Sequence, residues 1–122
     1  MISIDDFHKV EMRVGEILSA EPIEGSEKLL KLTVNFGSEE RQVVSGIRTY
    51  VEPTSLVGRR FAFATNLEPR VIMGLESQAM ILAVGGDDPS TPFDNAQGKP
   101  LGTSEPFAIL EAPGAAPGSR VK

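Results

Sequence analysis

Apolar residues alternate with polar residues in several short segments, and turn-forming residues separate these segments every ten or so positions. The clearest segment runs from Leu30 to Phe36, where every second residue is apolar. Alternation with a period of two places the apolar side chains on one face of a β-strand. Short strands of this kind, joined by regular turn signals, predict a small closed β-barrel.

We expect five strands in the barrel and a sixth near the C-terminus: 13–22, 30–36, 41–47, 59–65, 80–84 and 107–110. A short helix is expected at 51–58, because Pro53 suits a first helical position and Gly58 suits a helix end. The fold that fits is a five-stranded oligonucleotide/oligosaccharide-binding (OB) barrel with one short helix, an N-terminal helical turn and a C-terminal extension.

The chain has 122 residues, the size of a single domain. We expect its core at 10–84, a mobile loop at 85–105 and a C-terminal strand and tail at 106–122, since 85–105 is dominated by turn residues without a period. The N-terminal residues lack the pattern of a signal peptide, and no apolar run approaches the ~20 residues that span a bilayer. The expected location is therefore cytoplasmic, with no membrane partner.

The inventory of reactive residues excludes most catalytic and metal sites. The chain has no Cys and a single His, so disulfides, thiolate zinc sites and catalytic triads are not expected. The best case for an enzyme is a carboxylate pair, Glu16 with Glu76 or Asp87 with Asp88, but nothing marks these pairs as catalytic. We expect no catalytic residues, no metal and no cofactor.

The net charge restricts how this chain binds nucleic acid. The 12 Lys and Arg against 17 Asp and Glu give a formal net charge of −5. The molecule as a whole is therefore not attracted to the negatively charged phosphates of a nucleic acid. Nucleic-acid binding requires that the basic groups gather on one face, since affinity comes from local phosphate contacts.

Five motifs stand in order along the chain: Arg13-Val-Gly, Lys28-Leu-Leu-Lys31, Arg41-Gln-Val-Val-Ser-Gly-Ile47, Asn66-Leu-Glu-Pro-Arg70 and Gly74-Leu-Glu-Ser-Gln-Ala-Met80. Through them, residues 4–84 resemble the tRNA-binding domain found at the C-terminus of bacterial methionyl-tRNA synthetases and as small stand-alone proteins. The resemblance implies an OB barrel that is commonly a homodimer and recognises folded tRNA by shape, without catalysis. Its implied partners are tRNA, a second copy and a methionyl-tRNA synthetase.

The resemblance also implies tRNA-binding residues, matched position by position: Arg13, Lys28, Arg41, Ser45, Asn66, Arg70 and Ser77. Arg and Lys suit phosphate oxygens, while Asn and Ser bond phosphate, ribose or base edges. For the dimer interface we expect Phe7 and Phe107, which are apolar residues in otherwise polar segments. Without the resemblance, isolated cations on strand edges are better explained as solubilising groups.

Two positions depart from the family pattern. Glu68 stands where the family commonly has Lys, and Val71 stands where another cation is frequent. Their loss predicts weaker tRNA binding with a shallower salt dependence. The alternative function is that of a chaperone-like, peptide-binding dimer from the branch of the family associated with protein export. The acidic balance and Glu68 suit that branch, whereas the motifs at 41–47 and 66–69 resemble the synthetase branch.

Overall fold

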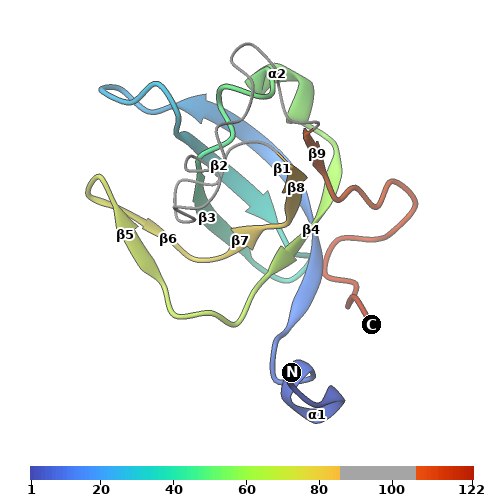
Figure 1. Ribbon diagram of the computed structural model, residues 1–122. Coiled ribbons are helices and arrows are strands. Elements are labelled where there is room, and N and C mark those ends of the chain that lie inside the picture. Colours follow the sequence, from blue (N-terminus) through green and yellow to red (C-terminus); the bar gives the residue numbers. More distant parts are fainter. Residues whose placement is uncertain (86–106) are drawn as a thin grey trace.

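A curled five-stranded antiparallel sheet forms the centre of the computed structural model, which describes residues 1–85 and 107–122 (Figure 1). The strand order is β3-β2-β1-β4-β7. These strands are β1 (Met12–Pro22), β2 (Leu30–Asn35), β3 (Glu40–Ser45), β4 (Arg60–Ala64) and β7 (Met80–Ile81). The sheet confirms the predicted all-β fold of the OB-barrel type.

The remaining elements are short: α1 (Ile4–Phe7), α2 (Pro53–Leu56), β5 (Arg70–Ile72), β6 (Leu75–Ser77), β8 (Ala83–Gly85) and β9 (Phe107–Ile109). Both helices lie where the sequence predicts them, and β9 lies within the predicted C-terminal strand. The predicted mobile loop at 85–105 falls outside the described residues, apart from Gly85 at the end of β8. No helix among the described residues is long and apolar enough to cross a membrane.

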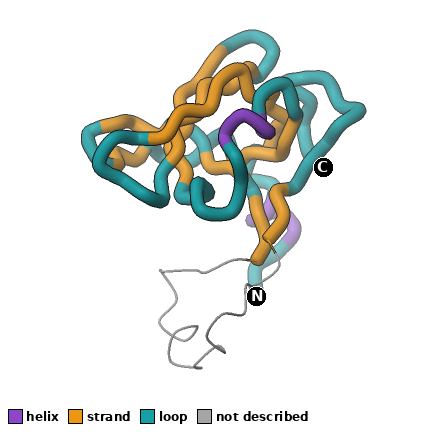
Figure 2. The backbone as a smooth tube through the Cα atoms, turned by 90° about the horizontal axis from the view of Figure 1, so that it is seen from above, coloured by secondary structure: helices purple, strands orange, loops and turns teal. Residues whose placement is uncertain are grey.

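The core lies inside the curl of the sheet. Leu30, Leu32 and Val34 of β2 are fully buried, and Phe61 and Phe63 of β4 meet them with at most 1% of their surface exposed. The alternation read from the sequence is therefore the alternation between core and outer face. Seen from above, α2 lies across one end of the barrel (Figure 2).

Gly15 allows β1 to pass tightly over this core. A Cβ atom at this position would lie 2.4 Å from Val34 Cγ1 and 2.8 Å from the ring of Phe36. The Phe36 ring in turn packs edge-on against Phe63, with 5.3 Å between the ring centroids. The absence of a side chain at Gly15 thus lets the strand approach the packed aromatic pair directly.

The strands β5 and β6 form a hairpin between the predicted strands 59–65 and 80–84, where the sequence pattern predicted no strand. Arg70 pairs with Ser77 in this hairpin. Met73 and Gly74 form its turn, with φ angles of 50° and 78°. Two successive residues with positive φ are typical of a type I′ turn, which Asn and Gly favour and Met does not. The turn therefore carries a weak sequence signal.

The segment after this hairpin covers the free edge of β3. The amide N–H of Gln78 donates to the carbonyl of Gln42 at 2.9 Å, and the amide N–H of Val44 donates to the hydroxyl of Ser77 at 3.0 Å. Unpaired strand edges invite pairing with other chains. Here the edge of β3 is partly closed by the chain itself, and the β5–β6 hairpin is held beside β3.

The C-terminal tail runs along the first half of β1. Val14 exchanges two backbone hydrogen bonds with it, one to Ser119 at 2.8 Å and one from Gly118 at 2.7 Å. β2 pairs with β1 only from Glu16 onward, so this half of the strand is open to another partner. The tail is thus an integral part of the barrel wall.

Candidate functional site

The cations of this chain fall into two groups. Six of those that the structure describes form salt bridges with a carboxylate: Lys9, Arg13, Lys31, Arg41, Arg59 and Arg60. Within residues 1–85 and 107–122, the lysines and arginines that form no salt bridge are Lys28, Arg48, Arg70, Arg120 and Lys122. Cations that no neighbouring carboxylate neutralises attract an external phosphate most strongly.

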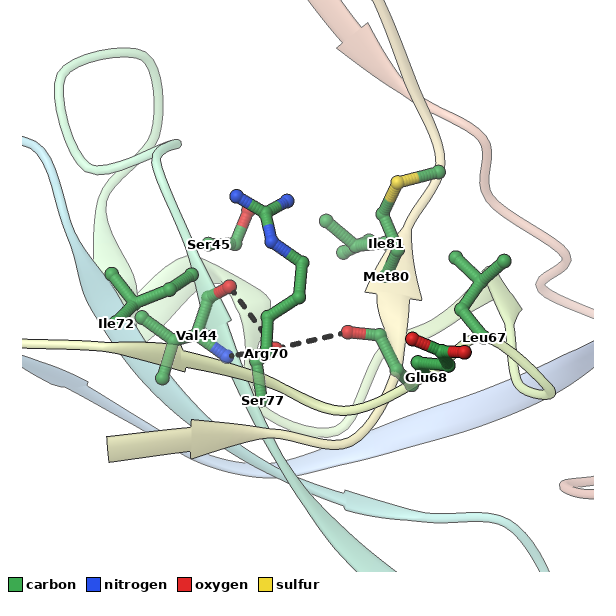
Figure 3. Close-up of a pocket in the computed structure, with 10 residues that line it drawn as sticks. Val44, Ser45, Leu67, Glu68, Arg70, Ile72, Ser77, Met80 and Ile81 are labelled. Atoms are coloured by element: carbon green, nitrogen blue, oxygen red, sulfur yellow. Dashed lines mark hydrogen bonds between the residues drawn. The ribbon is translucent and has the colours of Figure 1, made fainter. Parts of the chain in front are cut away.

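Three cations of the second group border the end of β3, and we call Lys28, Arg48 and Arg70 the cationic rim. The amide N–H of Arg48 donates to the carbonyl of Lys28 at 3.1 Å, and the Arg48 guanidinium donates to the carbonyl of Ser26. The Arg70 side chain reaches across from β5, so that its guanidinium lies beside Ser45 at the end of β3 (Figure 3). Residues from three separate segments thus share one edge of the barrel.

A pocket of about 430 Å³, including the solvent in its mouth, lies between β3, the β5–β6 hairpin and β7. Val44, Ile72 and Ile81 supply apolar walls, while Ser45, Glu68 and Arg70 supply polar ones. Figure 3 shows Arg70 standing over this pocket, with Glu68 on another side of it. An apolar hollow with a few convergent polar groups is typical of a ligand site.

The position of the pocket matches the usual binding surface of an OB barrel, which comprises strands 2 and 3 and the loops beside them. Lys28 lies in the loop before β2, and the hairpin lies in the loop between β4 and β7. Apolar walls next to cations suit a ligand that combines planar rings with phosphates. The arrangement can therefore hold a nucleotide unit of an RNA chain.

Of the seven residues expected to bind tRNA, Ser45, Arg70 and Ser77 line this pocket, and Lys28 lies in the loop before β2. Lys28 and Arg70 are exposed, and Ser45 is half-buried in the pocket wall. Ser77 and the other three residues make hydrogen bonds within the chain.

Arg41 connects three parts of the barrel. Its Nε and Nη2 atoms donate to Glu39 Oε1 at 3.0 and 2.7 Å, and its Nη1 atom donates to the carbonyl of Gln78 at 3.2 Å and to that of Thr65. The guanidinium also lies over the ring of Phe36, 5.6 Å from the centroid. The side chain therefore fastens β3 to the end of β4 and to the segment before β7.

Asn66 and Ser77 also use their polar atoms internally. Asn66 accepts a hydrogen bond from the amide of Glu11 at 2.7 Å and donates one to the carbonyl of Lys9 at 2.6 Å. The hydroxyl of Ser77, which is buried, accepts from the amide of Val44 and donates to the carbonyl of Ala79 at 3.1 Å. Asn66 thus ties the N-terminal segment to the barrel, and Ser77 ties the hairpin to β3.

Arg13 fastens the C-terminal tail. Its Nε atom donates to Glu11 Oε1 at 2.7 Å, and its Nη1 atom donates to the carbonyl of Gly118 at 3.0 Å. The hydrogen bond from Arg13, followed by one from the hydroxyl of Thr65, lowers the pKa of Glu11 from its ordinary value of 4.5. Folding therefore favours the ionised form of this carboxyl group.

We expect Glu11→Gln to lower stability at pH 7 and to lose this effect in acid. A carboxyl group with a depressed pKa contributes stability that is complete above pH 4.5 and disappears as the pH falls through the depressed value. The urea midpoints of the two proteins, compared at pH 7 and well below pH 4.5, should therefore converge in acid. Glu24→Gln, which alters an exposed carboxylate that forms no salt bridge with a described residue, is the control. A midpoint difference that is the same at both pH values would contradict the prediction.

The two residues expected at a dimer interface lie in different settings. Phe7 is 41% exposed on α1, which has no buried residue. Phe107 is half-buried and stacks on the ring of Tyr50 within the same chain, with 4.4 Å between centroids and 14° between planes. The contact of either residue with a second copy stays a prediction.

Sequence reasoning missed Arg48 as a member of the cationic rim. It directly follows the motif that ends at Ile47, but nothing in its sequence context separates it from a solubilising cation. From the sequence, Glu68 is only a position where the Lys common in the family is missing. The structure places it in the wall of the pocket. Both positions depend on how the loops fold back on β3.

A family model described as "Putative tRNA binding domain" matches residues 12–104. The chain belongs to this tRNA-binding domain family. The family describes a binding domain rather than a catalytic one. Its match begins at β1 and includes every residue of the pocket and the cationic rim.

Curated relatives of this tRNA-binding domain are methionine–tRNA ligases. The chain is 52% identical over 87 residues to the ligase of Deinococcus radiodurans and 50% identical over 92 residues to that of Clostridium tetani. The matches cover 71% and 75% of this chain but 13% and 14% of the ligases. The chain thus matches only a small part of the length of these relatives.

Solved structures with the same fold include a MetRS-related protein and a chaperone. The MetRS-related protein of Pyrococcus horikoshii is 35% identical with a TM-score of 0.79, and the match covers 100% of this chain and 98% of that one. The chaperone CsaA of Picrophilus torridus has a TM-score of 0.78 at 22% identity, with both chains fully covered. The second likeness shows the fold alone.

Proposed function

We propose that this chain is a non-catalytic module that binds folded tRNA through the cationic rim and the pocket below it. The observation that carries the proposal is that Lys28 and Arg48 lie side by side and Arg70 lines the pocket at the end of β3, in a chain whose net charge is −5. The six salt-bridged cations make the contrast clear, because their charge is balanced within the chain. Membership of the family supports tRNA as the ligand.

In this proposal, Lys28 and Arg48 contact phosphates, while Arg70 and Ser45 bond oxygens of the nucleotide at the pocket. These proposed contacts with RNA are few, and they are not arranged along the path of a long single strand. Aromatic platforms are the usual means of gripping single strands. The Tyr50 ring is already stacked on Phe107, which favours recognition of the shape of a folded RNA.

The proposal extends to a homodimer that acts alone or assists a methionyl-tRNA synthetase. The N-terminal segment exposes Ile2, Ile4 and Phe7, with 70%, 66% and 41% of their surfaces accessible. Burying such residues against a second copy would remove apolar surface from water. Two linked sites would raise apparent affinity through effective concentration. Light scattering at micromolar concentration tests this directly, and a mass of 13.1 kDa would exclude the dimer.

We expect Arg70→Ala to weaken binding of folded tRNA roughly tenfold and to reduce the salt slope by about one. Arg70 is exposed and has no carboxylate partner in the described part of the chain, so its loss removes an RNA contact without disturbing the barrel. The measurement is a titration with folded tRNA across a series of salt concentrations. Unfolded tRNA and single-stranded DNA serve as competing ligands.

The matched control is Arg59→Gln. Arg59 directly precedes β4, does not line the pocket, and pairs with Glu111 through two hydrogen bonds of 2.9 and 2.8 Å. Because Glu111 already balances its charge, its removal should leave the salt slope unchanged. Equal losses in the two variants would mean that general charge, rather than the cationic rim, controls binding.

The alternative function is that of a chaperone-like dimer that binds unfolded peptides. The apolar walls of the pocket and the carboxylate of Glu68 are the observations that favour it. Under this alternative, an unfolded polypeptide occupies the pocket and folded tRNA does not bind even at low salt. The same titration therefore separates the two functions.

A further inference from the structure

Glu68 is the unexplained group of the pocket. Its side chain forms part of the pocket wall, yet no described cation pairs with it, including Arg70 two residues away. The two side chains leave the chain in different directions, with Arg70 beside Ser45 and Glu68 beside Leu67 (Figure 3). The pocket thus presents donors on one side and an unpaired acceptor on the other.

We propose that this pocket takes one unstacked guanine base of a bound RNA and that Glu68 reads its Watson–Crick edge. The proposal rests on the proposed function, in which the cationic rim holds the RNA backbone beside the pocket. Single bases that leave the stack are commonly read in this way, by apolar contact with the ring and by hydrogen bonds to its edge.

The walls of the pocket suit a flat ring. Val44 and Ile81 are buried, and Ile72 is half-buried, so the hollow is lined by apolar atoms. Met80 borders it with 46% of its surface exposed, and its flexible thioether packs well against an aromatic face. Ile72 is held in place by the tight turn at Met73 and Gly74.

The arrangement of donors and acceptors selects guanine among the four bases. A carboxylate only accepts hydrogen bonds, and it accepts two parallel ones from N1–H and the N2 amino group of guanine. Arg70 and Ser45, which line the pocket away from Glu68, supply hydrogen-bond donors that the O6 and N7 acceptors of guanine can use. Uracil would instead turn toward the carboxylate a single N3–H that lies between two carbonyl oxygens. Adenine and cytosine would each offer only one amino group.

Glu68 then has two opposing effects on RNA binding. A carboxylate near phosphates lowers affinity for RNA in general, as the sequence predicts. Two charge-assisted hydrogen bonds to guanine compensate this repulsion only when guanine is present, because every other base leaves the carboxylate without parallel donors. The residue therefore lowers general affinity and raises selectivity.

The test is a titration of the isotope-labelled protein with GMP, IMP, AMP, CMP and UMP, followed by amide NMR signals. These probes share the ribose and the phosphate, and IMP differs from GMP only in lacking the N2 amino group. We expect shifts at Ser45, Ile72 and Ala79, which line the pocket. GMP should bind about tenfold more tightly than AMP, with IMP between them.

Glu68→Gln should abolish the preference for GMP over AMP, since an amide does not accept both parallel donors. Glu24→Gln removes the same charge from an exposed residue outside the pocket and should retain the preference. Equal binding of GMP and AMP by a protein that still binds folded tRNA would overturn the inference while leaving the proposed function intact. Loss of tRNA binding with retained GMP preference would overturn the proposed function instead.

Discussion

Gly15→Ala should destabilise the protein by at least about 3 kcal/mol, or prevent folding altogether. The added Cβ would lie 2.4 Å from Val34 Cγ1, 2.8 Å from Phe36 and 3.0 Å from Phe63. All three neighbours are core residues with at most 4% of their surface exposed, so none can move toward solvent. Tightly packed interiors relax little around an extra carbon atom.

Urea denaturation followed by circular dichroism measures this effect, and Gly46→Ala is its control. Gly46 follows β3, and a Cβ there would meet no atom within 4 Å. Its substitution should change the free energy of unfolding by less than about 0.5 kcal/mol. If Gly15→Ala unfolds at the same urea concentration as the original protein, β1 does not cross the aromatic pair as described.

Arg41→Ala should lower the free energy of unfolding by about 2 kcal/mol, while folded molecules still bind tRNA. Removal of the guanidinium leaves the carbonyls of Thr65 and Gln78 without this donor and removes a cation from the ring of Phe36. The side chain is only 24% exposed, so its chief contacts are internal. The family motif at this position thus maintains the barrel in which the pocket forms.

Arg41→Lys separates a structural role from an electrostatic one. Lysine keeps the positive charge but lacks the planar fork that reaches Glu39, Thr65 and Gln78 together. A phosphate-binding role predicts that Lys restores binding. The structure predicts instead that Arg41→Lys loses almost as much stability as Arg41→Ala. An Arg41→Lys protein that is as stable as the original would contradict this prediction.

The course of the sheet could be predicted because it follows local patterns. The alternation in β2 identified Leu30, Leu32 and Val34 as one face, and the structure buries all three. The β5–β6 hairpin could not be predicted in this way, since its strands have three residues each and Met73 occupies a turn position that other residues favour. Short elements of this kind are fixed by tertiary contacts, here those of Ser77 with β3.

The sequence predicted some residues of the candidate site, but it did not predict which of the named residues line the pocket. The motifs named Ser45 and Arg70, which line the pocket, and also Arg41 and Asn66, which do not. Sequence spacing cannot separate these cases, because the carbonyl groups that Arg41 contacts lie 24 and 37 residues away in the chain. The backbone groups that Asn66 contacts lie 55 and 57 residues away. Only the fold reveals which polar groups are already satisfied.

Mapping the surface that folded tRNA covers is the most direct test of the proposed function. Amide NMR signals of the labelled protein, recorded with and without folded tRNA at low salt, report this surface residue by residue. We expect the largest changes at Lys28, Ser45, Arg48 and Arg70, with little change at Arg59, which does not line the pocket. Changes centred on Arg59, or none at all, would contradict binding through the cationic rim.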